Sequence, residues 1–166
     1  MTQMVIVVGT NHSLQLANLE LKSVLEGLCH VFNVRAIGEE MSEEALAEKS
    51  CAASIPMQIA AAFQLAHRLC DPNTAERATL GIRQEGQIRM AVWPSRYPLP
   101  EPEVIRLLKE SYEIRERYWL EQLRSLNVWP VLFICGSDHV TSFCRLLKQQ
   151  SIQTHVAAED WLSTCQ

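Results

Sequence analysis

The chain has 166 residues, of which 48% are hydrophobic and 20% are charged, and its formal net charge is −4. This length predicts one domain that can bury a core of its own. The acidic balance argues against non-specific nucleic-acid binding, because such binding depends on Lys and Arg side chains that neutralise phosphates. A cation, a metal ion or a neutral small molecule remains as the class of ligand to expect.

The cysteines and the N-terminus indicate a protein of a reducing compartment. The six cysteines include no C-x-x-C pair, so motifs of the zinc-ribbon and thioredoxin type are absent. The N-terminal segment lacks the charged region of a signal peptide, and no stretch approaches the roughly 18 apolar residues that span a bilayer. We therefore expect reduced thiols, a cytoplasmic location and no membrane partner.

The first part of the chain predicts a strand, a helix and a second strand. Residues 4–8, MVIVV, are mostly β-branched and apolar, as expected of a buried parallel strand. Apolar residues then recur at helical spacing from Leu14 to Leu28, and residues 34–37 resume a strand pattern. This order predicts a right-handed βαβ unit over residues 1–40.

Residues 41–100 predict a helical insertion that ends in a loop. Residues 43–80 have helical character in two or three pieces, with a break near Asp71, which precedes a proline. Residues 82–100 are the least regular part of the chain. We expect there a short β-hairpin around Gly86 or a mobile loop.

The last part of the chain, residues 101–166, predicts a long helix and a second βαβ unit. Apolar and aromatic residues recur at intervals of three and four over residues 101–126. Strands are predicted at 131–135 and 153–158, with a helix at 139–150 between them. The fold class is therefore α/β, with a mostly parallel central sheet of about four core strands flanked by helices in a single domain. The aromatic residues of the long helix also predict a homodimer through it.

The same motif, Gly-x-x-His, follows the first strand of both βαβ units. It occupies residues 9–12 and residues 136–139. In each unit a helix, a second strand and a pair of acids come next, Glu39-Glu40 in the first unit and Glu159-Asp160 in the second. The shared plan indicates an internal repeat of one βαβ unit, with the helical middle inserted between the copies.

Two such corners can place two imidazoles at one site. Parallel strands release their loops at the carboxyl edge of the sheet, where ligands bind, and glycine there lets the backbone approach a ligand closely. We expect His12 and His139 to face one crevice at this edge. Ligand contacts are also expected from other residues of the same corners: Gly9, Asn11, Gly136 and Asp138.

Imidazole and carboxylate groups together suit a divalent metal ion such as Mn, Co, Fe or Zn. His12, His139 and Glu40, or Glu39 in place of Glu40, would hold the metal, and the other glutamate would serve as base. The metal would lower the pKa of a bound water and polarise a carbonyl or phosphoryl oxygen. In a site without metal, one histidine would act as the general base and a glutamate would orient it.

The helix before the second motif carries Arg115 and Arg117 in the segment EIRERYWLEQL, residues 113–123. One of these arginines is predicted to reach the crevice and to hold a carboxylate ligand or an oxyanion. The alternative is a solvated helix face on which Glu113 pairs with Arg117. Position along the helix leaves both interpretations open.

A purely structural role of the two motifs is a further alternative. In that case Gly9 and Gly136 would permit tight helix packing, and His12 and His139 would bond to backbone at the starts of their helices. That arrangement predicts two imidazole rings far apart, whereas a shared site predicts two rings close together.

These features resemble the TraB-like superfamily, which includes TraB/PrgY proteins, Tiki proteases, and ChaN-type and erythromycin esterase-type relatives. The resemblance lies in the paired Gly-x-x-His motifs, the acids after VRAI, and the segment IRERYWLEQLRSL that leads to VLFICGSDHVTSFCRLL. It covers residues 1–40 and 113–150. It implies an α/β fold with both histidines at one site. Members are known or proposed as metal-dependent proteases, as other hydrolases, or as heme-related and pheromone-inactivating proteins, so the resemblance implies a site more than a substrate.

Two functions fit the sequence. The first is metal-dependent hydrolysis of a small amide, ester or phosphoester, with Arg115 or Arg117 at the developing negative charge. The second is a non-catalytic module that binds a small ligand or nucleotide in the same crevice and signals to a protein partner. Few basic residues lie near the motifs, which argues against a nuclease.

Overall fold

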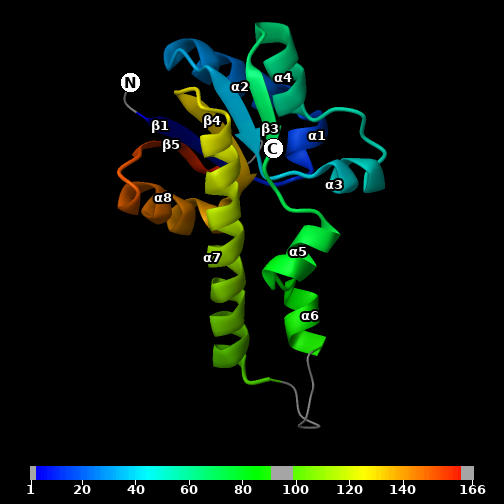
Figure 1. Ribbon diagram of the computed structural model, residues 1–166. Helices are drawn as coiled ribbons and strands as arrows, with labels where there is room; N and C mark the ends of the chain where they lie inside the picture. Colours follow the sequence, from blue (N-terminus) through cyan, green and yellow to red (C-terminus); the bar gives the residue numbers. More distant parts are fainter. Residues whose placement is uncertain (1–2, 91–98, 162–166) are drawn as a thin grey trace.

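A five-stranded parallel sheet forms the centre of the protein (Figure 1), whose computed structural model describes residues 3–90 and 99–161. The strand order is β3-β2-β4-β1-β5, and all four pairs of neighbours are parallel. The strands are β1 (Met4–Thr10), β2 (Ala36–Glu39), β3 (Ala66–Leu69), β4 (Val131–Gly136) and β5 (Gln153–Trp161). The predicted α/β class is confirmed.

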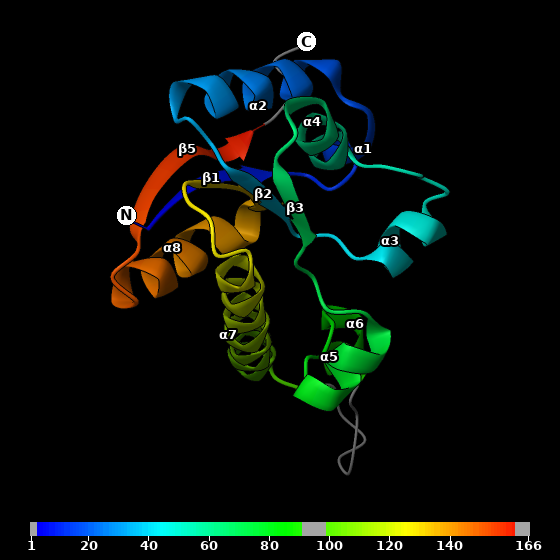
Figure 2. The ribbon, with the colours of Figure 1, turned by 45° about the horizontal axis from the view of Figure 1, so that its top comes forward.

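Helices cover both faces of this sheet, as Figure 2 shows. The helices are α1 (Leu14–Ala17), α2 (Leu19–Val31), α3 (Glu43–Glu48), α4 (Ile55–Phe63), α5 (Thr74–Leu80), α6 (Glu85–Met90), α7 (Glu101–Ser125) and α8 (Val140–Gln149), with the 3-10 turn η1 (Ser137–His139) before α8. Even-numbered residues of β1 pack with α2 and α4, and odd-numbered residues pack with α7 and α8. The alternation of side chains along a strand therefore builds two cores, one on each face.

The chain leaves the two central strands in opposite directions. From β1 it passes through α2 on one face to β2, and from β4 it passes through α8 on the other face to β5. Since β1 and β4 are neighbours, with Thr10 beside Gly136, the sheet has a topological switch point between them. A crevice is expected at the carboxyl ends of such a strand pair. Both Gly-x-x-His corners lie there.

The insertion contains a strand where we predicted only helix. Helix α4 ends at Phe63, the next residue, Gln64, has a φ of 54° in the left-handed region, and the chain then forms β3 beside β2. The strand has only four residues, Ala66–Leu69, and lies at the sheet edge. Its period-two pattern was too short to separate from the helical residues around it. The sheet consequently has five strands instead of about four.

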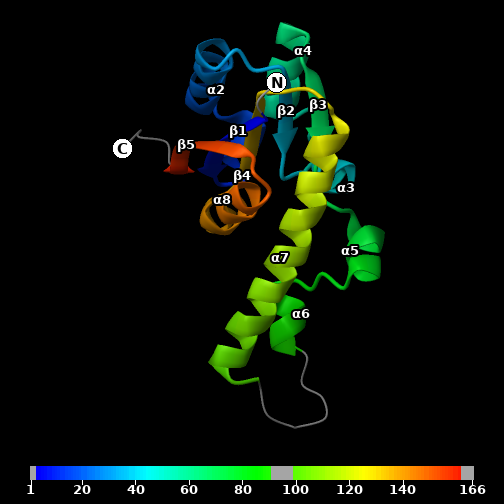
Figure 3. The same cartoon turned by 60° about the vertical axis from the view of Figure 1, so that its left-hand side comes forward.

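The prediction of a hairpin around Gly86 is wrong, because residues 85–90 form helix α6. Its Ile88 is fully buried and α6 packs on α7. The rest of the predicted loop, residues 91–98, lies outside the described residues. The long helix is confirmed as Glu101–Ser125, and Figure 3 shows its first half running beside α5 and α6, away from the sheet.

The aromatic residues that suggested a homodimer mostly pack inside the domain. Trp119 is fully buried, and the ring of Tyr112 lies 4.1 Å from the ring of His139. These side chains therefore give little support to a dimer through α7. The dimer stays a prediction, which light scattering tests.

Among residues 3–90 and 99–161, no helix is long and apolar enough to cross a membrane. The five cysteines in these ranges are free thiols, and Cys165 lies outside them.

Candidate functional site

A pocket of about 410 Å³ opens at the carboxyl edge of the sheet, above the switch point. Both motifs line it, since Asn11 and His12 follow β1, Gly136 ends β4 and residues 137–139 follow it. Tyr112 and Arg115 of α7 complete one wall, and Glu40 lies at the end of β2. With Asp160 of β5, the tertiary structure thus joins residues from five separate parts of the chain.

Glu40 is the common partner of the groups in this pocket. It is almost fully buried, and its Oε1 lies 2.8 Å from Nη2 of Arg115, 3.4 Å from Nε2 of His12 and 3.8 Å from Nε2 of His139. The backbone N–H of Gly136 donates to Oε2 at 2.6 Å. Both imidazoles therefore face one carboxylate oxygen, as a shared site requires.

The surroundings of Glu40 keep its carboxylate ionised. Burial by itself would raise the pKa of Glu40, but the hydrogen bond from His12 and the charges of Arg115, His12 and His139 outweigh burial and lower the pKa to about 2. A carboxylate with so low a pKa, and with partners on both oxygens, is a poor general base. In this geometry its carboxylate holds Arg115, His12 and the backbone N–H of Gly136 around the pocket.

His12 is the more exposed of the two histidines, with 42% of its side-chain surface accessible. The hydrogen bond to Glu40 raises the pKa of His12, against the opposing effect of burial and of Arg115. Its Nδ1 is buried and has no hydrogen-bond partner among the residues that the structure describes. His12 is thus a ring whose charged form is favoured and whose Nε2 lies beside Glu40 at the pocket.

His139 is held on three sides. Its Nδ1 lies 2.9 Å from Oε1 of Glu116, which also accepts a hydrogen bond from the hydroxyl of Ser142 at 2.6 Å. The rings of Tyr112 and Trp119 lie 4.1 and 4.8 Å from its ring centre. Since a carboxylate can only accept, the tautomer that fits this contact carries its proton on Nδ1 and has its lone pair on Nε2, which faces the pocket.

Arg115 is fixed by a second buried carboxylate. Its Nε and Nη2 donate to the two oxygens of Asp71 at 2.6 and 2.8 Å, and its Nη1 lies 3.5 Å from Nε2 of His139. Asp71 also accepts from the indole N–H of Trp119 at 3.1 Å and pairs with Arg77. This bidentate geometry aims the guanidinium at the pocket and limits its motion.

Comparison of the chain with protein-family models, with curated proteins and with solved structures found no match. The TraB-like resemblance therefore stays a prediction from the motifs.

The pleat of β2 separates the two candidate glutamates. Glu40 enters the pocket, whereas Glu39 is buried on the α4 side of the sheet. There Glu39 accepts from Ser54, and Nε2 of His67 lies 2.9 Å from the same carboxylate oxygen. The proposed role of Glu39 at the pocket thus has no geometric support.

The rotation of α7 separates the two candidate arginines in the same way. Arg115 lines the pocket, and Arg117 is exposed on another face of the helix. Of the expected ligand-contacting residues, Asn11, Gly136 and Asp138 line the pocket. Gly9 does not, because it lies within β1 against β5, where a Cβ atom would collide with the carbonyl oxygen of Glu159. The role of Gly9 is close strand packing.

Asp71 and Glu116 are site residues that sequence reasoning did not select. We interpreted Asp71 as part of a turn, and only the unexpected strand β3 brings it beneath Arg115. Glu116 had a usable signal, because it lies four residues after Tyr112 and three before Trp119, in line with the apolar face of α7. A charge on a buried helix face needs a partner, and here that partner is His139.

The expected metal ligands lie together, but the arrangement does not fit a metal ion as it stands. No three His, Cys, Asp or Glu side chains in the described ranges are placed to hold a metal ion. The guanidinium of Arg115 lies beside Glu40 and His139, where a metal ion would have to bind. A permanent cation thus already supplies positive charge at this point.

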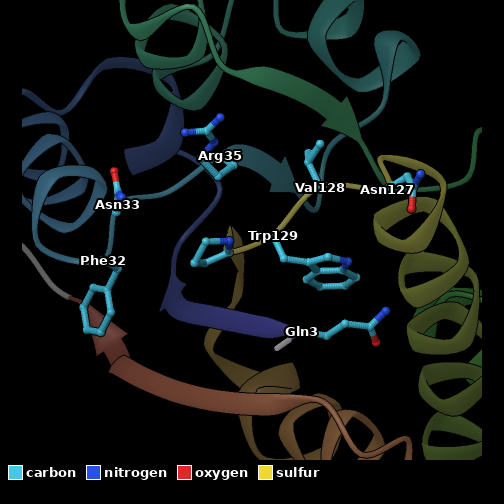
Figure 4. Close-up of a pocket in the computed structure, with 8 residues that line it drawn as sticks. Gln3, Phe32, Asn33, Arg35, Asn127, Val128 and Trp129 are labelled. Carbon is cyan, nitrogen blue, oxygen red and sulfur yellow. The ribbon is translucent and has the colours of Figure 1, made fainter. Parts of the chain in front are cut away.

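A second hollow, of about 670 Å³, opens at the opposite edge of the sheet. Figure 4 shows Trp129 on one side of it and Phe32 and Asn33 on the opposite side. Arg35 carries the one ionisable side chain among the eight residues that line this hollow. The pocket at the carboxyl edge, by contrast, is lined by several ionisable side chains.

Proposed function

We propose that the chain is a hydrolase of a small ester, amide or phosphoester, in which two histidines share the proton transfers. The observation that carries the proposal is the geometry of His139. Glu116 binds its Nδ1 at 2.9 Å, and its Nε2 faces the pocket beside Glu40 and Arg115. A histidine that is oriented by a carboxylate at one ring nitrogen and presents the other, here at a long 3.5 Å from Nη1 of Arg115, to a pocket is the usual arrangement of a general base.

In the first step, Nε2 of His139 accepts a proton from a water molecule while the water oxygen attacks the carbonyl carbon or the phosphorus of the substrate. Glu116 fixes the ring tautomer and stabilises the imidazolium that forms. Tyr112 and Trp119 pack on the ring and prevent it from turning away from the pocket. Orientation of this kind lowers the entropic cost of the step.

His12 and Arg115 serve the other half of the reaction. The imidazolium of His12, favoured by Glu40, donates a proton to the leaving group as its bond breaks. Arg115 faces the developing negative charge with Nη1, which does not bind Asp71 or Glu40 and lies 3.5 Å from Nε2 of His139. The proton on His139 then returns to His12 through solvent, so the site is restored after each turnover.

The metal-dependent version of this hydrolase remains a separate prediction, and it requires Arg115 to move. Elemental analysis of the purified protein, together with activity after dialysis against a chelator, distinguishes the two versions. The proposal made here expects activity without bound metal. The alternative of a non-catalytic binding module expects ligand binding with no turnover on long incubation.

A panel of chromogenic esters, amides and phosphoesters tests the proposal. His139→Gln should lower kcat on the order of 10²- to 10⁴-fold, the usual contribution of a general base. His30→Gln is the matched control, because His30 is an exposed histidine on α2 outside the pocket. If His139→Gln is folded and hydrolyses the best substrate as fast as the control, His139 is not the base.

A further inference from the structure

A smaller hollow of about 210 Å³ adjoins the pocket and extends away from the sheet. It lies between α7 and the segment that carries α5 and α6, the part of the molecule that Figure 3 shows beside the first half of α7. Tyr112 and Arg115 line both hollows. A molecule bound at His139 can therefore continue past these two side chains into the groove, which we call the arginine groove.

The arginine groove and the pocket differ in charge. The groove is lined by Arg77, Arg83 and Arg115, and its one acidic lining residue, Glu85, pairs with Arg89 at 2.7 Å. The pocket instead contains the carboxylates of Glu40, Asp138 and Asp160. In a chain of net charge −4, this local excess of arginine is a specific feature of one surface.

Arg83 brings uncommitted donors to this groove. Within the described ranges, its guanidinium has no hydrogen-bond or ion-pair partner, and the side chain is exposed. Its backbone is nevertheless fixed, because the buried hydroxyl of Ser111 accepts from the Arg83 N–H at 2.9 Å and donates to the Arg83 carbonyl at 2.8 Å. A charged side chain on an anchored backbone, with all its donors available, is suited to bind an anion.

Arg77 differs from Arg83 in that part of its guanidinium is already engaged. Its Nε donates to the carbonyl of Pro72, and its Nη2 pairs with Asp71. Nη1 has no partner among the residues that the structure describes. Arg77 can therefore add one further donor beside those of Arg83.

The length of the groove follows from the helix that forms its floor. Leu108 and Arg115 both line it and are seven residues apart on α7, which corresponds to roughly 10 Å along the helix axis. Arg83 is anchored at Ser111, next to Tyr112, so a terminal anionic group bound by Arg83 would lie beyond Tyr112 from the reacting bond near His139.

We propose that the arginine groove binds a terminal oxyanion of the substrate, so that the substrate is a small hydrolysable molecule with a carboxylate or phosphate at its far end. The assignment of the far group to a substrate rests on the proposed hydrolase. Binding of the oxyanion itself does not, and it is measured independently of turnover.

Anion binding is tested by titrating inorganic phosphate and, separately, acetate into the full chain and following backbone amide signals by NMR. The two arms distinguish a phosphate-type from a carboxylate-type oxyanion. Arg83→Gln should weaken binding of the preferred anion about tenfold, as expected when a hydrogen bond to a charged group is lost. Arg83→Lys keeps the positive charge but loses the forked guanidinium, so its affinity should lie between those of the wild type and Arg83→Gln. Arg117 lies on α7, which borders the groove, but does not line it. Arg117→Gln should therefore bind the anion like the wild type.

The kinetic arm compares an ester that has a terminal carboxylate or phosphate with its neutral methyl-capped counterpart. Arg83→Gln should raise KM about tenfold for the anionic ester, with kcat unchanged, and leave the neutral ester unaffected. Equal affinity of wild type and Arg83→Gln for both anions would overturn the anion site, whether or not the chain is a hydrolase. Loss of anion binding in Arg83→Gln, in a chain without turnover on any substrate, would support the anion site while removing the hydrolase.

Discussion

Nη2 of Arg115 lies 2.8 Å from Oε1 of Glu40, while Nε and Nη2 of the same guanidinium hold both oxygens of Asp71. One cation thus bridges two buried carboxylates, one at the end of β2 and one just after β3. This ion-pair network lines the pocket and also connects α7 to the sheet. Each of the following predictions tests one consequence of this network.

Removal of the bridging cation should destabilise the protein. Arg115→Gln leaves Glu40 and Asp71 buried side by side without their shared positive charge, which we expect to cost about 3 kcal/mol of the free energy of unfolding. Urea unfolding measures it. Arg117→Gln is the matched control and should change the stability by less than about 0.5 kcal/mol. Equal midpoints and slopes for the two variants would contradict the role assigned to the bridge.

The lowered pKa of Glu40 predicts a dependence of stability on pH. Its contribution is full above the ordinary carboxyl pKa of 4.5 and is lost as the pH falls toward 2. The shift from 4.5 to about 2 corresponds to about 3 kcal/mol. Glu40→Gln should therefore flatten the acid limb of stability against pH, measured by urea unfolding between pH 7 and pH 3. Glu48→Gln, on the exposed surface of α3, should keep that limb, and a flat limb in both would show that Glu40 is not its source.

The raised pKa of His12 depends on Glu40. Its stabilising effect is full below the ordinary histidine pKa of 6.5 and is lost as the pH rises through the higher value of the folded state. In Glu40→Gln the largest cause of the shift is gone, so the pKa of His12 should fall. NMR titration of the imidazole signals, assigned by His12→Gln, measures the change. An unchanged midpoint in Glu40→Gln would place the cause elsewhere.

Glu116 is expected to act on catalysis through His139. An amide at this position can donate to Nδ1 and favour the wrong ring tautomer, so Glu116→Gln should lower kcat at least on the order of 10²-fold with little change in KM. The pH profile of kcat should also move, since a carboxylate no longer stabilises the imidazolium. Ser142→Ala, which removes only the second hydrogen bond to Glu116, should have a much smaller effect. A KM effect alone, with an unmoved pH profile, would mean that Glu116 only supports the fold.

Much of the architecture follows from local patterns. The apolar runs of β1 and β4, the period of α7 and the helix after each motif are readable because their signals depend on neighbouring residues. Strand β3 and helix α6 were missed because each has only four to six residues, too few for a period to be distinguished.

By itself, the sequence determined which residue types stand at the ends of the central strands, and hence that two histidines and an acid could share one edge of a parallel sheet. It did not decide whether Glu39 or Glu40, or whether Arg115 or Arg117, faces the pocket. It also gave no sign that Asp71 belongs to the site. Only the tertiary structure decided these, through the pleat of β2, the rotation of α7 and the pairing of β3. The physical reason is that periodicity acts between neighbours along the chain, whereas a buried charge is settled by the partner that the folded chain brings to it.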